Sequence, residues 1–366
     1  MGFNCGIVGL PNVGKSTLFN ALTETAAAEA ANYPFCTIEP NTGRVAVPDP
    51  RLDALAALAK SQNIIPTQLE FVDIAGLVQG ASKGEGLGNQ FLGNIREVDA
   101  IAHVLRCFDD SDITHVDGDV DPVRDAQTVE TELMLADIDS IERRMTALVK
   151  KSRGGDAESK ADLALLEKLS AHLADGKPAR SNDSLTEVEQ KRLPQLQLLT
   201  AKPVLYVCNV AEFDAATGNS YSQKVAEMAA TQQAGHVIVS AAIEAEISQL
   251  DANDKGEFLA ELGLEEAGLA RLIRSGYGLL NLLTFFTVGP KEARAWTVAN
   301  GATAPQAAGV IHTDFQRGFI RAETISFDDY IACKGEAGAK DAGKFRIEGA
   351  EYKVVDGDVF HFRFNV

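Results

Sequence analysis

Residues 9–16 read Gly-Leu-Pro-Asn-Val-Gly-Lys-Ser, which is the pattern of a glycine, four variable residues and then Gly-Lys-Ser/Thr. The residues before it, 3–8, form a short apolar run that predicts a buried strand. The residues after it, 17–22, carry apolar side chains at helical spacing. The motif therefore lies between a strand and a helix, which is the position that a phosphate-binding loop requires.

This loop has the residue types that phosphate binding needs. Two glycines allow the backbone to turn tightly, so that successive N–H groups point inward. Those donors and the positive end of the following helix bind polyphosphate. We expect Lys15 to reach the β- and γ-phosphates and the Ser16 hydroxyl to bind Mg²⁺. The residues predicted to bind the nucleotide here are Asn12, Val13, Gly14, Lys15, Ser16 and Thr17.

The length of 366 residues favours two or three domains. No apolar run has the length of a membrane span, and the N-terminus lacks the basic start of a signal peptide, so we expect a soluble, cytoplasmic protein without membrane contact. The histidines include no His-x-x-x-His pair and the cysteines have no metal-ligand spacing, so we expect no metal site made of protein ligands alone. Instead we expect buried thiols in a reducing compartment.

The formal net charge of −18 argues against a protein that coats nucleic acid. The charge is uneven along the chain: residues 282–366 contain 10 Lys/Arg and 11 Asp/Glu, or about −1, which leaves about −17 for residues 1–281. Contact with RNA would therefore need a local basic patch, in the middle of the chain or in its C-terminal third.

Two further motifs contain the residue types that complete a magnesium and γ-phosphate site. Residues 32–41 are rich in proline, asparagine and threonine, which predicts a loop, and Thr37 is its candidate for binding Mg²⁺ and contacting the γ-phosphate. Asp73 ends an apolar strand, where the second carboxylate linked to Mg²⁺ belongs, and Gly76 is placed to offer its N–H to the γ-phosphate. We therefore predict catalytic residues Lys15, Thr37 and Gly76 and metal ligands Ser16, Thr37 and Asp73.

Leu77 occupies the position that follows this Asp-x-x-Gly motif. Many GTPases place a glutamine there to orient the attacking water. A leucine forms no hydrogen bond to water through its side chain, so hydrolysis must use another group, an ion or a partner. Residues 80–88 are rich in glycine, and we expect them to be mobile and to become ordered when nucleotide binds. A plain flexible loop is compatible with the same composition.

The loop after the predicted strand 203–208 indicates which nucleotide base the protein prefers. It reads Asn-Val-Ala-Glu at 209–212, where a GTPase normally has Asn-Lys-x-Asp. The aspartate accepts hydrogen bonds from guanine; here Glu212 displaces the carboxylate by one methylene and Val210 removes the lysine. Guanine preference should weaken. Adenine preference does not follow from these residues alone, because a glutamate can still accept from guanine.

A second loop is expected beside the base. Residues 234–239 predict the last strand of the sheet, and Ser-Ala-Ala follows at 240–242. Base-contacting loops of GTPases usually read Ser-Ala-Lys here, so Ala242 departs from that pattern as well. The residues predicted to form the base pocket are Asn209, Val210, Glu212, Ser240 and Ala241.

Residues 109–202 form an insertion between two predicted strands, because these 94 residues are far more than a parallel crossover needs. Residues 129–138 and 161–173 have helical spacing, and the basic run 150–155 between them is typical of a turn, so two long antiparallel helices fit best. The basic turn is a candidate for contact with RNA or a partner, although such clusters are more often solvated loops.

From residue 282 the pattern changes to that of a small domain dominated by sheet. Residues 284–288, 295–298 and 318–324 are strand-like, and a proline near the start of 301–308 introduces a helix. Residues 352–364 contain Asp-Gly between two alternating runs, which predicts a hairpin or a bend.

Together these motifs closely resemble the YchF group of Obg-like ATPases, and the match covers essentially the whole chain. The matching stretches are long and specific: 9–16, 35–41, 73–78, 82–92, and the runs 301–309 and 312–320, which look like this family's TGS domain. The resemblance implies an α/β P-loop NTPase (a Ras-like G domain with a mostly parallel sheet), an inserted antiparallel helical hairpin and a C-terminal α+β TGS domain of β-grasp type. We expect these parts at 1–124 with 201–281, at 125–200 and at 282–366.

The resemblance also implies chemistry that spacing does not show. The loop 209–212 looks like the family's signature for ATP over GTP, and Leu77 is similar to its substitution for the catalytic glutamine, which accompanies slow turnover. Mg²⁺ is the implied cofactor, and Asn12 is similar to the asparagine that binds K⁺ beside the phosphates in some members. The family associates with ribosomes. We therefore expect a monomer that contacts the ribosome, through its large subunit, or RNA, using the helical insertion and the TGS domain; a face that binds protein or nothing is the alternative.

Three functions are compatible with these features. The first is a slow, Mg²⁺-dependent ATPase that acts as a conformational switch on the ribosome in translation and stress control. The second is a GTPase of the Obg type. The third is a binding module whose partner interaction needs ATP but not its hydrolysis, so that a non-hydrolysable ATP analogue would support its full function.

Overall fold

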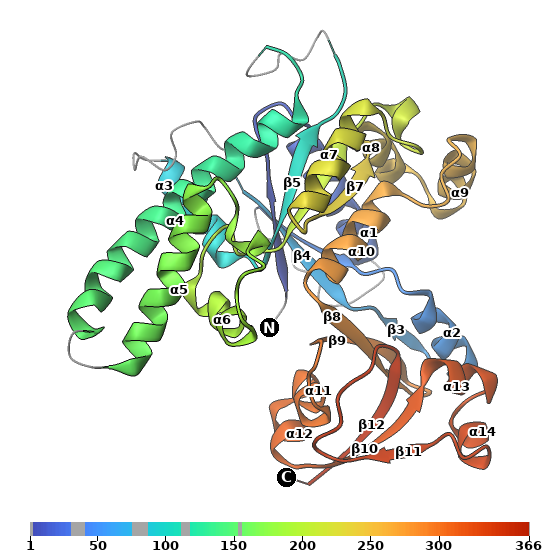
Figure 1. Ribbon diagram of the computed structural model, residues 1–366. Helices are drawn as coiled ribbons and strands as arrows, with labels where there is room; N and C mark the ends of the chain where they lie inside the picture. The colour runs from blue at the N-terminus through green and yellow to red at the C-terminus, as the bar shows by residue number, and fades with distance from the viewer. Residues whose placement is uncertain (1–2, 31–40, 75–86, 111–117, 153–155, 366) are drawn as a thin grey trace. The chain divides into compact units, whose positions relative to one another are not determined.

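The computed structural model describes residues 3–30, 41–74, 87–110, 118–152 and 156–365 (Figure 1). The chain forms two compact units. The larger unit consists of Met1–Ala28, Thr37–Arg44 and Glu70–Leu279, and the smaller unit of Glu29–Cys36, Val45–Leu69 and Leu280–Val366. Each unit contains a sheet, and each is described by itself.

A six-stranded sheet with the strand order β2-β4-β1-β5-β6-β7 organises the larger unit. Its strands are β1 (Asn4–Val8), β2 (Thr42–Ala46), β4 (Gln68–Asp73), β5 (Ala100–Arg106), β6 (Val204–Asn209) and β7 (Gly235–Val239). β1 pairs in parallel with β4 and β5, and β6 pairs in parallel with β5 and β7. β5 and β6 are buried along their whole length, as expected for strands that are covered on both faces. The mostly parallel sheet of the predicted α/β fold is therefore confirmed.

Helices connect these strands and cover the sheet. They are α1 (Lys15–Ala30), α3 (Leu87–Glu97), α7 (Ser220–Thr231), α8 (Ala241–Gln249), α9 (Ala252–Glu261) and α10 (Gly268–Leu279). α10 packs over β5, β6 and β7 with its apolar face, which contains Leu269, Leu272 and Ile273. The thiols of Cys5, Cys107 and Cys208 lie free in the interior of this unit, and burial raises the pKa of Cys5 to about 12.

The predicted helical insertion is present as two long helices, α4 (Pro122–Ser152) and α5 (Ala157–Ala174), which lie side by side (Figure 1). Their facing side chains form a hydrophobic core around Ile141, Leu165 and Leu169. α4 also packs against β5 and α7, and the predicted start of the insertion, residue 125, falls in the first turn of α4. The chain returns from α5 to β6 through η2 (Ala179–Ser181), α6 (Glu187–Arg192) and η3 (Leu193–Leu196).

A buried polar cluster joins this insertion to the sheet, and we call it the Arg180 cluster. Arg180 donates through Nη1 and Nη2 to the two carboxylate oxygens of Glu130 on α4, at 2.7 and 2.8 Å. Its Nη2 also donates to Gln232 Oε1 at 3.0 Å, and the Tyr206 hydroxyl on β6 lies 2.6 Å from Gln232 Oε1 and 3.1 Å from Glu130 Oε2. The Arg180 and Glu130 side chains are each 7% exposed, so water hardly reaches the ion pair.

His103, on β5, lies beside the Arg180 cluster. Its ring centroid is 5.7 Å from that of Tyr206, and the side chain is buried. Its Nε2 has no hydrogen-bond partner in the part of the chain that the structure describes. Burial lowers the pKa of His103 to about 4; the Glu130 carboxylate opposes this shift and the Arg180 guanidinium adds to it.

We expect His103 to make the free energy of unfolding depend on pH. The unfolded chain protonates this histidine near pH 6.5 and the folded chain only near pH 4, so between these values the unfolded state binds more protons. Stability should therefore fall as the pH drops through this window, by up to about 3 kcal/mol from His103 alone. Denaturant titrations of wild-type and His103→Phe protein between pH 4 and 7 measure this contribution as a difference. Equally steep pH dependence in both proteins would contradict the assignment.

The smaller unit contains a mixed sheet with the strand order β11 (Arg346–Glu348), β10 (Phe319–Ser326), β12 (Asp358–Phe364), β8 (Leu282–Val288), β9 (Glu292–Ala299) and β3 (Asn63–Ile65). β8 and β9 are antiparallel, β10 is antiparallel to β11 and β12, and β12 is parallel to β8. Phe285 and Phe286 on β8 lie in two different hydrophobic clusters, because successive side chains of a strand point to opposite faces. Residues 352–364 form a bend at Gly357 (φ 88°) and not a hairpin, since β12 pairs with β10 and β8.

The elements of this unit follow the predicted α+β pattern from residue 282 onward. The helices are α2 (Pro50–Ala59), α11 (Ala304–Ile311), α12 (Thr313–Arg317), α13 (Phe327–Ala332) and α14 (Glu336–Asp341). Within the described ranges of both units, no helix combines the length and hydrophobicity of a membrane span.

The smaller unit also contains residues that we predicted for the nucleotide-binding domain. Val45–Leu69 cluster with the C-terminal residues: β3 pairs in parallel with β9, and α2 buries Leu52 and Leu55 in the same hydrophobic cluster as Phe286. The predicted boundary differs here because a three-residue strand and a short helix carry no sequence signal that identifies their partner elements.

Candidate functional site

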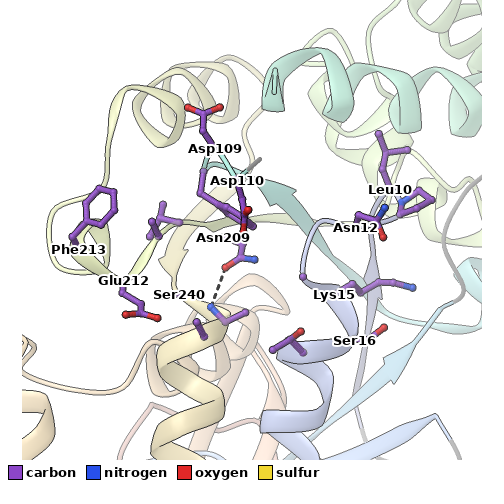
Figure 2. Close-up of a pocket in the computed structure, with 18 residues that line it drawn as sticks. Leu10, Asn12, Lys15, Ser16, Asp109, Asp110, Asn209, Glu212, Phe213 and Ser240 are labelled. Atoms are coloured by element: carbon purple, nitrogen blue, oxygen red, sulfur yellow. Dashed lines mark hydrogen bonds between the residues drawn. The ribbon is translucent and has the colours of Figure 1, made fainter. Parts of the chain in front are cut away.

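A cavity of about 880 Å³ lies in the larger unit, at the carboxyl ends of β1, β5, β6 and β7 (Figure 2). Ligands bind at this edge of parallel α/β sheets because the loops that follow the strands meet there. The lining residues are Leu10, Pro11, Asn12, Gly14, Lys15, Ser16, Thr17, Phe108, Asp109, Asp110, Asn209, Val210, Ala211, Glu212, Phe213, Ser240, Ala241 and Ala242.

The cavity brings together most of the residues predicted to bind nucleotide. Its wall contains the phosphate-loop residues Asn12, Gly14, Lys15, Ser16 and Thr17 and the predicted base-pocket residues Asn209, Val210, Glu212, Ser240 and Ala241. The Val13 side chain is instead buried beneath the loop, and Asp73 lies beside Lys15 at the end of β4. The predicted residues Thr37 and Gly76, together with Leu77 and residues 80–86 of the glycine-rich run, lie outside the described residues, whereas residues 87 and 88 begin α3.

The phosphate loop has a backbone that suits an anion. Asn12 and Gly14 have positive φ values of 63° and 89°, and such conformations turn successive N–H groups toward one side of a loop. A Cβ atom on Gly14 would clash with Asn209 Nδ2, so space as well as φ favours glycine there. Leu18 N donates to Gly14 O at 3.0 Å, so the first turn of α1 begins within the motif. Loop donors and a helix N-terminus therefore coincide, as phosphate binding requires.

Lys15 contacts the end of β4. Its Nζ donates to Ile74 O at 2.8 Å and lies 3.2 Å from Asp73 Oδ1. Asp73 Oδ1 is buried and accepts no hydrogen bond from the residues that the structure describes. A buried carboxylate oxygen short of donors suits a cation, and Mg²⁺ usually takes only one or two protein ligands beside phosphate and water. Asp73 and the Ser16 hydroxyl therefore fit the magnesium ion that phosphate-loop chemistry uses.

Asn209 connects three loops of the cavity. Its Oδ1 accepts from Ala241 N at 2.9 Å, and its Nδ2 donates to Val13 O at 2.9 Å (the first of these is drawn in Figure 2). The side chain is buried. Since both ends of the amide group bind protein backbone, Asn209 holds the phosphate loop and the start of α8 in register with the end of β6. Sequence reasoning placed this residue at the base and did not identify this positioning role.

The other end of the cavity is lined by polar and apolar side chains. Glu212 is exposed there, whereas Val210 and Ser240 are buried. Ser240 Oγ is buried and has no hydrogen-bond partner among the described residues. Four lining residues lie outside every motif that the sequence analysis singled out: Phe108, Asp109 and Asp110, which follow β5, and Phe213, which follows Glu212. The sequence signal that could have identified them is their position directly after a predicted strand or a predicted motif.

This arrangement defines a nucleotide-binding domain of the P-loop NTPase class. It combines a phosphate loop, the contact of Lys15 with Asp73 at the end of β4, and two base-side loops. Residues 4–151 match a family model described as "50S ribosome-binding GTPase", and residues 282–365 match the YchF-GTPase C-terminal model, described as "Protein of unknown function (DUF933)". Full-length curated relatives extend this match, and the chain belongs to the YchF family.

Those relatives are each named "Ribosome-binding ATPase YchF". The chain is 60% identical to the protein of Haemophilus influenzae, 59% to that of Escherichia coli O157:H7 and 54% to that of Bacillus subtilis, with 100% of both chains covered in each case. The fold is also similar to a solved structure described as the Schizosaccharomyces pombe YchF GTPase, with a TM-score of 0.90 and 39% identity over 99% of this chain and 98% of that one. The family assignment and the P-loop NTPase fold predicted from the sequence are thus confirmed.

Proposed function

We propose that this protein binds and slowly hydrolyses ATP with Mg²⁺ and acts as a conformational switch on the ribosome. The observation that carries the proposal is that one cavity joins the phosphate loop to a base-side wall in which the described residues include no lysine. In that wall Val210 and Ala242 stand where GTPases have lysines. The names of the bacterial relatives give ATP and the ribosome as ligands of those proteins, and we extend both to this chain.

At the phosphate end, the chain supplies positive charge and N–H donors. We assign the triphosphate to the loop N–H groups of residues 12–17, and the β- and γ-phosphates to Lys15. Ser16, Thr37 and Asp73 are the residues that would hold Mg²⁺, which when bound offsets the negative charge of the β- and γ-phosphates. The N–H groups of Thr37 and Gly76 would contact the γ-phosphate. Water attacks in line with the leaving oxygen, and Leu77 cannot orient it, which is the reason to expect slow turnover.

At the base end, Asn209 supports the pocket and Glu212, Ser240 and Ala241 offer contacts. Guanine presents N1–H and N2–H₂ as donors, and a carboxylate at the position of the usual aspartate would accept from both. Glu212 moves that carboxylate by a methylene, and Val210 replaces the lysine stem with a shorter apolar side chain. The weakened contacts reduce the preference for guanine, and the ATPase names of the bacterial relatives are the ground for expecting ATP.

An Obg-type GTPase is the second candidate. Glu212 is exposed at the cavity and can still accept from guanine. The solved relative from Schizosaccharomyces pombe is also described as a GTPase. A module that needs ATP binding without hydrolysis would use the same cavity, and it differs from the ATPase in needing no turnover.

Calorimetric titration with non-hydrolysable ATP and GTP analogues, in Mg²⁺ and K⁺, tests the proposal. We expect the ATP analogue to bind at least about tenfold more tightly, which corresponds to about 1.4 kcal/mol. The reasons are the weakened paired contacts to guanine and the ATPase names of the full-length relatives. Equal or tighter binding of the GTP analogue would contradict the proposal and favour the GTPase. Substituting Na⁺ for K⁺ in the same titration tests the further assignment of K⁺ to Asn12.

For the partner, we propose the large ribosomal subunit, contacted through the helical insertion and the smaller unit, by a monomer in the cytoplasm. Relatives that share the full length of this chain are named as ribosome-binding, which supports the proposal. The net charge of about −17 over residues 1–281 makes general binding to RNA unfavourable, so contact must be local.

A further inference from the structure

Phe213 is the most exposed large hydrophobic side chain among the described residues. Its side chain is 86% exposed, whereas the next most exposed, Val188, is 67% exposed. It lies in the short helix η4 (Glu212–Asp214), directly after the glutamate of the base loop. Single exposed apolar residues are common on protein surfaces. The position of this one gives a specific reason for its exposure.

The backbone on both sides of Phe213 is held in place. Val210 N donates to Val239 O at 2.9 Å, which ties the residues before η4 to β7. Asn219 Nδ2 donates to Asp214 Oδ2 and to Cys107 O, both at 2.8 Å, which ties the residues after the ring to α7 and to the end of β5. Phe213 therefore belongs to an anchored loop. The exposed ring is a consequence of that fold rather than of a loose segment.

The anchored loop places the ring at the base end of the cavity. Phe213 lines the cavity with Phe108 and Val210. Figure 2 shows Phe213 and Lys15 at opposite ends of the drawn site. A nucleotide with its triphosphate at Lys15 would extend its base toward the end where Phe213 lies. An aromatic ring there offers a flat apolar surface that costs little side-chain entropy to order.

We propose that Phe213 stacks on the base of the bound purine nucleotide and adds affinity without choosing between adenine and guanine. Every base presents a π-face, so stacking tolerates any base, whereas hydrogen bonds to base edges select one. Residues 210–213 then have two separate roles. Phe213 adds affinity for any nucleotide, whereas Val210 and Glu212 determine which base is preferred. This inference rests on the proposed binding of nucleotide in the cavity.

The test compares three ligands on one variant. Phe213→Ala should bind a non-hydrolysable ATP analogue and a GTP analogue more weakly by the same factor, about tenfold, the lower part of the range for a base stacked on an aromatic side chain. Inorganic triphosphate, which has no base, should bind wild type and variant equally. Phe213→Trp should retain nucleotide affinity, and Val188→Ala, an exposed apolar residue outside the cavity, should change nothing.

A fluorescence experiment supplies an independent measurement. The chain has a single tryptophan, Trp296, so a Phe213→Trp/Trp296→Phe protein carries its tryptophan only at the cavity. Nucleotide should quench this emission and inorganic triphosphate should not, because quenching needs a stacked base.

Three outcomes would overturn the proposal. If Phe213→Ala binds nucleotide with an affinity within twofold of wild type, Phe213 does not contribute by stacking on the base. Equal losses for nucleotide and inorganic triphosphate show that the residue supports the loop and not the base. Wild-type protein that binds neither nucleotide overturns the proposed function along with this inference, and this last result is distinct from the first two because they require a wild type that binds.

Discussion

Replacing Lys15 with methionine should lower the single-turnover rate of ATP hydrolysis by at least about 100-fold, since removing one preorganised group that stabilises developing charge typically costs 10²–10³ in rate. Methionine keeps an unbranched side chain of similar length and removes only the ammonium group. That group is the cation placed at the end of β4, 3.2 Å from Asp73 Oδ1. Phosphate release from a small amount of ATP, with enzyme in large excess and concentrated enough to bind all of it, measures the rate of the chemical step.

A second lysine provides a matched control for this variant. Lys202 Nζ also donates to backbone carbonyl oxygens, those of Arg96 and Val98, but it lies outside the cavity wall. Lys202→Met therefore removes a comparable contact between an ammonium group and the backbone, and it should leave hydrolysis unchanged. A Lys15→Met rate within tenfold of wild type, with Lys202→Met normal, would show that Lys15 is a structural residue that fastens β4.

The Lys15 variant also tests whether the ammonium group compensates the carboxylate of Asp73 in the folded protein. In wild type the ammonium group partly compensates a buried carboxylate oxygen that has no hydrogen-bond donor among the described residues. In the variant, a bound Mg²⁺ would supply positive charge beside this carboxylate in place of the ammonium group. We therefore expect thermal stability of Lys15→Met to depend on added Mg²⁺ more strongly than that of wild type.

The strand, loop and helix start at residues 3–22 were predictable from the sequence because their information is local. A strand, a glycine-containing turn and a helix start lie within about twenty consecutive residues, and each has its own signature of apolar spacing or turn chemistry. The parallel sheet follows similarly, because buried strands such as β5 and β6 read as continuous apolar runs. The C-terminal strands were equally visible as alternating runs.

Features that depend on contacts across the chain were not predicted. Asn209 was assigned to the base by its motif, yet its hydrogen bonds reach Val13 and Ala241, at sequence separations of 196 and 32. The place of Val45–Leu69 in the smaller unit depends on the pairing of β3 with β9, and no periodicity in a three-residue strand encodes that partner. Phe213 differs in kind: an aromatic residue is expected inside a protein, and its 86% exposure became apparent only in the structure.

Replacing Arg180 with methionine should destabilise the larger unit by about 3–5 kcal/mol, because it leaves the buried Glu130 carboxylate without its cation. The pair is bidentate and 7% exposed on both sides. The tryptophan lies at residue 296 in the smaller unit, so fluorescence does not report this change. Denaturant unfolding followed by far-ultraviolet circular dichroism, with hydrogen exchange of the β6 amides, does report it.

Arg143→Met is the matched control for this second variant. Arg143 pairs with Asp139 on the same helix, α4, at 2.6 Å, but the two side chains are 70% and 67% exposed. An exposed pair of this kind contributes about 0–1 kcal/mol, so its loss should be hard to measure. A similar, small effect of both arginine variants would mean that water reaches the Arg180 cluster and that its burial does not set its energy.

The double variant Arg180→Met/Glu130→Met decides why the buried pair is present. Apolar replacements of a buried ion pair often leave stability unchanged or raise it, because no charge then remains to be desolvated. If the double variant is as stable as wild type, the pair is not needed for stability. Its remaining effect would be geometric: it fixes α4 to Tyr206 on β6, three residues before Asn209, which in turn holds the phosphate loop. In that case a stable double variant should bind nucleotide more weakly than wild type, whereas unchanged binding would exclude a link between the helical insertion and the site.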